Sequence, residues 1–64
     1  MDKKERFYKI YNNLPLSLRD EIILVINVND HKEPITWRVA KLYIDEETKL
    51  GEDILGKLER LRII

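Results

Sequence analysis

The sequence predicts a mainly α domain of four helices, and three observations support this fold class. Apolar residues recur with helical spacing near both ends of the chain and again over residues 37–45. Polar residues suited to N-capping precede these stretches. The 64 residues are enough for one domain with a thin core, so we treat residues 1–64 as a single domain.

The first expected helix covers residues 2–13. One face carries apolar side chains at i, i+3, i+4 and i+7, namely Phe7, Ile10, Tyr11 and Leu14. Asp2 is a suitable N-cap, and Glu5 lies three residues later, as in a capping box. Pro15 ends the helix, because the residue before a proline is disfavoured in helical conformation.

Residues 17–28 fit two structures. Ser17 is a suitable N-cap, and one helical face would then hold Leu18, Ile22, Val25 and Ile26. Residues 22–28 are also rich in β-branched side chains, which favour a buried strand. Strict alternation of apolar and polar residues is absent, so we favour a helix and keep the strand as the alternative. Residues 29–34 follow as a polar loop.

Two more helices are expected in the second half of the chain. Thr36 caps the helix of residues 37–45, whose apolar face holds Trp37, Val39, Ala40, Tyr43 and Ile44. The helix of residues 48–61 has a buried stripe of Leu50, Ile54, Leu58 and Leu61, with Leu55 at its edge. Residues 62–64 form a short apolar tail suited to pairing as a strand.

From residue 17 onward, these segments resemble the core of winged helix-turn-helix domains, which are common in prokaryotic transcription regulators. The resemblance rests on Thr36 as a helix cap, on Ala40 as a small residue facing the third core helix, and on the apolar spacing of Ile54, Leu55, Leu58, Leu61, Ile63 and Ile64. It implies a small tri-helical helix-turn-helix core over residues 17–64 with an extra N-terminal helix over residues 1–13. Because the sequence stops at residue 64, we expect at most a rudimentary β wing.

The resemblance also implies binding to double-stranded DNA and a role in transcription regulation. The basic residues in position to contact DNA are Arg38, Lys41, Lys49, Lys57, Arg60 and Arg62. The charge distribution weakens this expectation, because 12 basic residues balance 12 acidic ones. Residues 1–13 carry a net charge of +2, whereas residues 45–53 carry −4, at the turn where phosphates should arrive.

Gly56 is expected near the middle of the exposed face of the last helix, where glycine costs about 1 kcal/mol relative to alanine. Either a phosphate or a partner helix approaches the backbone there, or the glycine is merely tolerated on the surface.

The alternative function is a protein-interaction or dimerisation module that keeps the fold without DNA binding. The candidate homodimer interface is the apolar and aromatic cluster of Phe7, Tyr8, Ile10 and Tyr11. This cluster packs either on the core of its own chain or on a second copy, because small domains often gain stability by dimerising. We expect Trp37 and Tyr43 in the core.

The composition argues against an enzyme, a metal site or a membrane protein. The chain has no cysteine, His31 is its only histidine, and no glycine-rich phosphate loop is present. We therefore expect no catalytic residue, cofactor, metal or small-molecule substrate. The longest apolar run, residues 22–26, is far below the about 20 residues that cross a bilayer. With no secretory signal visible, we expect a cytoplasmic protein, and its abundance of Lys, Glu and Arg is typical of thermophiles.

Overall fold

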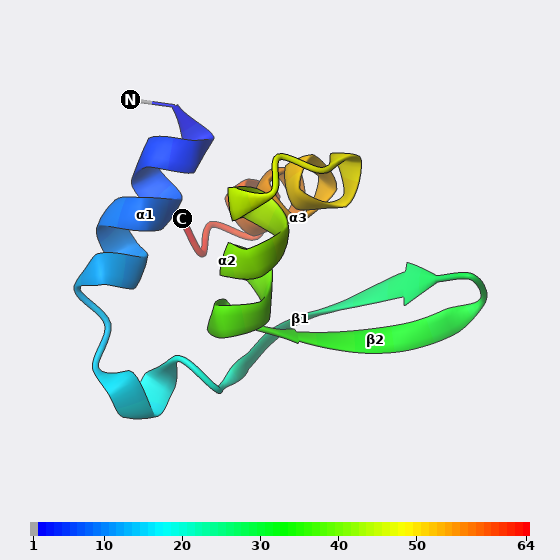
Figure 1. Cartoon of the computed structure of the whole chain (residues 1–64), viewed down its shortest axis with the longest axis horizontal. Coiled ribbons are helices and arrows are strands. Elements are labelled where there is room, and N and C mark those ends of the chain that lie inside the picture. The colour runs from blue at the N-terminus through cyan, green and yellow to red at the C-terminus, as the bar shows by residue number, and fades with distance from the viewer. Residues whose placement is uncertain (1) are drawn as a thin grey trace.

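The computed structural model describes residues 2–64, which form three α-helices and one two-stranded antiparallel sheet. In chain order these elements are α1 (Lys3–Asn12), the short 3-10 helix η1 (Leu16–Leu18), β1 (Ile22–Val28), β2 (His31–Thr36), α2 (Trp37–Asp45) and α3 (Lys49–Arg60). Figure 1 shows α1 and α2 side by side, α3 crossing near α2, and the β1–β2 hairpin projecting away from α1. The mainly α class is confirmed, whereas β1 was expected only as the alternative to a helix and β2 was not expected.

Side-chain caps begin each of the three α-helices close to the expected positions. Asp2 accepts a hydrogen bond from the Glu5 backbone N–H at 2.8 Å. Thr36 accepts one from the Val39 N–H at 3.1 Å. Thr48 accepts from the N–H at position 51 at 2.9 Å. Each cap supplies an acceptor to an otherwise unpaired donor of the first turn, typically worth about 1 kcal/mol.

The helix expected over residues 17–28 is wrong. Only Leu16–Leu18 form a turn of 3-10 helix, and Ile22–Val28 form β1. Residues 22–28 therefore form the strand that was kept as the alternative, because β2 supplies the hydrogen-bonding partner that an isolated segment lacks. The tri-helical core that the resemblance implied loses its first helix in consequence.

The polar loop expected over residues 29–34 is also wrong, because most of it belongs to β2. Asn29 and Asp30 both have positive φ, 50° and 66°, as the central residues of a type I′ hairpin turn do. Pro34 pairs with Val25 within β2, a strand at the edge of the sheet, where proline is tolerated. Ile23 lies at an irregularity in the pairing of β1, between Ile22 and Leu24.

The core joins one face of each helix to one side of the hairpin. Its buried residues are Phe7, Tyr11, Ile26, Ile35, Trp37, Ala40, Ile44, Ile54, Leu55 and Leu58. The Phe7 ring lies 5.8 Å from the Trp37 ring and 5.9 Å from the Tyr11 ring, measured between centroids. An aromatic cluster thus joins α1 to the start of α2, as expected for Trp37, whereas Tyr43 is only partly buried.

The buried stripe of α3 differs from the expected one. Leu55 is buried and Leu61 is 59% exposed, so the stripe is rotated toward Leu55. The chain after α3 does not form a strand. Arg62 has φ 60°, and the Ile63 N–H donates to the Leu58 carbonyl at 2.9 Å, as in a Schellman helix ending.

Candidate interaction surface

A groove runs between α3 and β1 on the face of α3 that points away from the core. Its larger part has a volume of about 240 Å³ and is lined by Ile26, Asn27, Leu50, Glu52, Asp53, Gly56, Lys57 and Arg60. A second hollow of about 180 Å³ adjoins it and is lined by Leu24, Lys57, Arg60 and Leu61. Because the two share Lys57 and Arg60, we treat these ten residues as one α3–β1 groove.

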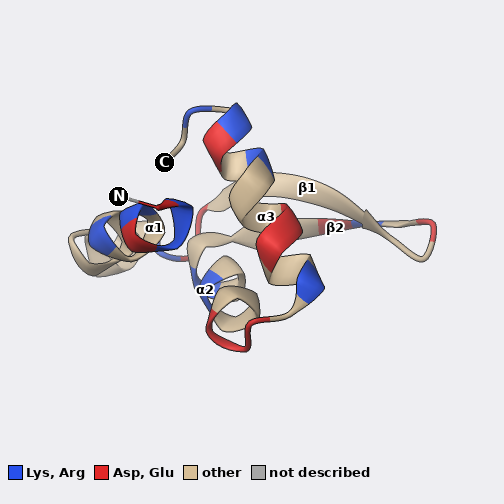
Figure 2. Ribbon diagram, turned by 90° about the horizontal axis from the view of Figure 1, so that it is seen from above, with Lys and Arg blue, Asp and Glu red and all other residues tan. Residues whose placement is uncertain are grey.

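The groove has apolar side chains at its base and charges of both signs along α3. Glu52 and Asp53 line the half nearer the start of α3, and Lys57 and Arg60 line the other half. Figure 2 shows that α3 carries charges of both signs along its length. Within residues 2–64, none of these four side chains takes part in an ion pair, although four ion pairs form elsewhere. They remain available to a partner.

Gly56 lies in this groove between the acidic and the basic pair. A Cβ placed on Gly56 would have no atom within 4 Å, apart from its own helical surroundings. The position is therefore open, and its glycine relieves no steric conflict within the chain. The sequence predicted Gly56 on the exposed face of the last helix, and in the structure Gly56 is half-buried and lines the groove.

Two of the basic residues expected to bind DNA, Arg38 and Lys41, form ion pairs within the chain. Arg38 forms an ion pair with Asp20 at 2.8 Å, in the segment that precedes β1. Its guanidinium lowers the pKa of the Asp20 carboxyl by hydrogen bonding. Lys41 pairs with Asp45 at 2.7 Å and lies 5.7 Å from the centre of the Tyr11 ring. Both cations of α2 thus contact other parts of the chain.

The remaining expected DNA contacts are on or beyond α3. Lys57 and Arg60 line the α3–β1 groove, and Lys49 is exposed at the first residue of α3. Arg62 follows the helix in left-handed conformation, the position where glycine is usual in a helix ending.

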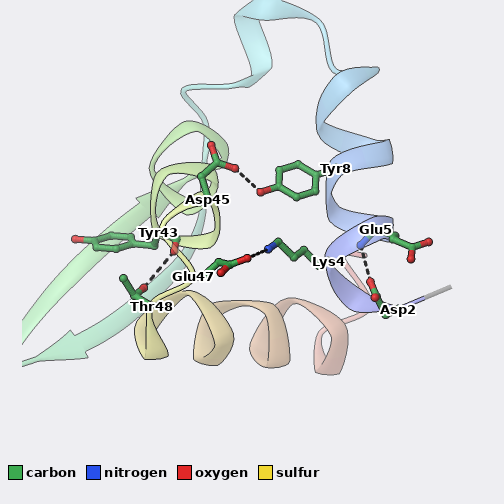
Figure 3. Close-up of polar contacts among 8 residues, drawn as sticks. All are labelled: Asp2, Lys4, Glu5, Tyr8, Tyr43, Asp45, Glu47 and Thr48. Carbon is green, nitrogen blue, oxygen red and sulfur yellow. Dashed lines mark hydrogen bonds and ion pairs between the residues drawn. The ribbon is translucent and has the colours of Figure 1, made fainter.

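The expected dimer cluster is divided between the core and the surface of α1. Phe7 and Tyr11 are buried in the core of their own chain, one of the two arrangements that the sequence left open. Ile10 is partly buried against that core. Tyr8 points toward α2 and donates a hydrogen bond to the Asp45 carboxylate (Figure 3). Phe7 and Tyr11 therefore offer no free surface in this structure.

Acids near the α2–α3 turn hold α1 in place. Lys4 pairs with Glu47 at 3.0 Å, beside the hydrogen bond from Tyr8 to Asp45 (Figure 3). Partial burial and the Asp45 carboxylate raise the pKa of Tyr8 to about 12. Hydrogen bonds from Lys41 and Tyr8 lower the pKa of Asp45. The positive N-terminal region thus meets part of the negative region within the same chain.

Sequence reasoning missed the apolar part of the groove. Leu24 was assigned to an uncertain segment, and Leu61 was placed in the buried stripe. The position of Leu61 could have indicated that it lies in the groove. Leu61 lies about one turn after Lys57, at the end of a helix whose core-facing side already has Ile54 and Leu58.

No group of three or more potential metal ligands occurs among residues 2–64. In the same range, no helix has both the length and the apolar character needed to cross a membrane. Comparison of the chain with protein-family models, with curated proteins and with solved structures finds no match.

Proposed function

We propose that this chain is a protein-interaction module and that the α3–β1 groove is its binding surface. The observation that carries the proposal is the groove itself, which combines exposed Leu61 and partly buried Leu24 and Leu50 with four charges that have no ion partner within residues 2–64. Protein interfaces commonly have an apolar centre and a charged or polar rim. The equal numbers of acidic and basic residues suit a protein partner better than a polyanion.

Site-specific photocrosslinking tests this function. A photoreactive phenylalanine analogue replaces Leu61 in the groove or, as a control, the exposed Lys9 on α1. We expect a discrete protein adduct at position 61 in extracts of the source cells and no such adduct at position 9. The adduct should disappear when the groove charges are reversed by Lys57→Glu and Arg60→Glu. Equal adducts at both positions, or no adduct at position 61, would contradict the proposal.

A second candidate is DNA binding by α2 and α3 as a helix-turn-helix unit. Its support is the resemblance to winged helix-turn-helix domains, together with two capped helices joined by the short connection of residues 46–48. Lys49, Lys57, Arg60 and Arg62 would supply the phosphate contacts on or beyond α3, because Arg38 and Lys41 are held in intramolecular ion pairs.

Fluorescence anisotropy with a labelled mixed-sequence duplex at low salt tests the second candidate. DNA binding requires an affinity that falls steeply as salt is added, and a larger loss for Lys57→Glu with Arg60→Glu than for the exposed hairpin control Lys32→Glu. Absence of binding at about 10 µM protein in low salt would reject it.

A further inference from the structure

The four charges of α3 that line the groove reverse sign about Gly56, whereas Lys49 and Glu59 of the same helix do not line it. Glu52 and Asp53 precede Gly56 by four and three residues, and Lys57 and Arg60 follow it by one and four residues. All four side chains line the same α3–β1 groove as Gly56. A helix face with acidic residues at one end and basic residues at the other is complementary to an antiparallel copy of itself.

We propose that the partner in the α3–β1 groove is a second copy of this chain, with the two α3 helices antiparallel about a two-fold axis near Gly56. The proposal rests on the proposed function, since it names the partner of the same surface. In a two-fold interface, every contact from residue i to residue j occurs twice. The two residues of a contact must therefore lie at equal distances on either side of the axis.

Two pairs of opposite charges satisfy this condition with nearly the same centre. Glu52 meets Arg60 of the second copy, and their midpoint along α3 is Gly56. Asp53 meets Lys57 of the second copy, with a midpoint one residue earlier. A parallel arrangement in register would instead place like charges opposite one another, which is unfavourable.

The apolar residues of the groove share this centre. Leu50 lies six residues before Gly56 and Leu61 lies five residues after it. The same axis therefore brings Leu61, which is 59% exposed, onto Leu50 of the second copy. At 100° per residue, Leu50, Asp53, Lys57 and Leu61 lie on one side of the exposed face, and Glu52, Gly56 and Arg60 lie on the other. A two-fold axis perpendicular to the plane of the two helix axes keeps each side of this face on the same side of the interface. The two residues of each pair therefore meet, because both lie on the same side of α3.

Gly56 allows the two backbones to approach closely at the axis. Glycine within a helix costs about 1 kcal/mol relative to alanine, and nothing within the chain requires it at this position. A second helix crossing at Gly56 supplies a reason, because the missing Cβ removes the atom that would otherwise separate the two helices.

The area available predicts a weak dimer. A stable interface buries about 800 Å² per partner, roughly a sixth of the 4620 Å² surface of this chain. Twelve-residue α3 is about 18 Å long, so its exposed face and Leu24 provide less than that. We expect dissociation constants of about 10–100 µM.

Sedimentation equilibrium with charge-reversed variants tests the dimer. One variant carries Glu52→Lys and Asp53→Lys, which makes the face basic, and the other carries Lys57→Glu and Arg60→Glu, which makes it acidic. Each alone should remain a monomer of about 7.7 kDa, as like charges then meet across the axis. Mixed in equal amounts they should form a heterodimer, because every position that pairs across the axis then again meets an opposite charge. Lys32→Glu is a control that should dimerise like the wild type.

Gly56→Ala gives an independent readout that does not depend on charge. The new methyl group meets no atom of its own chain, so the variant should fold and be at least as stable as the wild type, while its dimer weakens at least tenfold. A wild-type chain that stays monomeric at about 500 µM, or charge-reversed variants that dimerise alone, would overturn the proposed dimer. A photocrosslinked adduct between position 61 and a different protein would then still support the interaction module. The dimer can therefore be rejected without rejecting the proposed function.

Discussion

Gly51 of α3 lies directly against the backbone of Tyr43 in α2. A Cβ at position 51 would come within 2.5 Å of the Tyr43 carbonyl oxygen. The Thr48 hydroxyl lies in the same contact and donates to that carbonyl at 3.2 Å (Figure 3). The same hydroxyl accepts a hydrogen bond from the Gly51 N–H at 2.9 Å. α2 and α3 therefore cross at backbone contact distance, and only glycine fits at this crossing.

The two glycines of α3 should respond to alanine in opposite directions. Gly51→Ala should lower the free energy of unfolding by about 1–3 kcal/mol, because overpacking against the Tyr43 backbone outweighs the gain in helix propensity. Gly56→Ala, in the same helix and without any clash, should raise it by up to about 1 kcal/mol. Urea denaturation of both variants at a concentration where the protein is monomeric measures the difference. A stabilised Gly51→Ala variant would show that α2 and α3 do not cross this closely.

The contact from Tyr8 to Asp45 should make stability depend on pH in the alkaline range. The pKa of Tyr8 is raised from 10.0 to about 12, so folding favours its protonated form. This contribution is fully present below pH 10 and is lost as the pH rises toward 12. Tyrosinate absorbance, recorded as the difference between wild type and Tyr8→Phe, should therefore titrate near pH 12. A difference that titrates near pH 10 would show that Tyr8 is free in solution.

Asp45 should make the stability of the protein depend on pH in the acidic range. Hydrogen bonds from Lys41 and Tyr8 lower its pKa, so its contribution to stability is present above the usual pKa of an aspartate and is lost as the pH falls through the lowered value. Asp45→Asn should reduce the acid-induced loss of stability, measured as the melting temperature between neutral and acidic pH. Glu46→Gln is the matched control, because exposed Glu46 has no ion pair within residues 2–64 and should leave the acid dependence unchanged.

The hairpin turn should be improved by glycine. Asp30 has φ 66°, a conformation that costs a non-glycine residue about 1 kcal/mol. Asp30→Gly, which creates the preferred Asn-Gly type I′ turn, should raise the free energy of unfolding by about 0.5–1 kcal/mol. Asp30→Val should lower it, because a β-branched residue is poorly tolerated at positive φ. Thermal denaturation followed by circular dichroism compares both variants, and equal melting temperatures would argue against this turn.

Phe7 and Leu61 should separate core stability from binding. Phe7 is fully buried, so Phe7→Ala should cost about 3–5 kcal/mol and leave a small domain largely unfolded. Leu61→Ala should change the free energy of unfolding by less than about 1 kcal/mol, because Leu61 is 59% exposed, yet it should weaken binding in the groove. Denaturation and sedimentation on both variants provide the test. A tolerated Phe7→Ala would contradict the burial of α1 in the core.

Part of the candidate site follows from helical periodicity alone. The face of α3 that carries Asp53, Gly56, Lys57 and Arg60 was expected to be exposed, and these residues do line the groove. Leu24 and Leu61 could not be assigned to the groove in this way. Both line the same hollow although they are 37 residues apart in the sequence, and a contact of that range leaves no local signal.

The sequence by itself determined the three α-helices, because their signals are local. Asp2, Thr36 and Thr48 stand just before apolar residues at helical spacing, and caps and periodicity act within a few residues. Tertiary structure decided the rest. Residues 22–28 suit either a helix or a strand locally, and pairing with His31–Thr36 selects the strand. The net charge of zero likewise does not reveal that α1 contacts the acids near the α2–α3 turn. Strand pairing and these ion pairs both require partners that are distant in sequence, so local sequence patterns do not predict them.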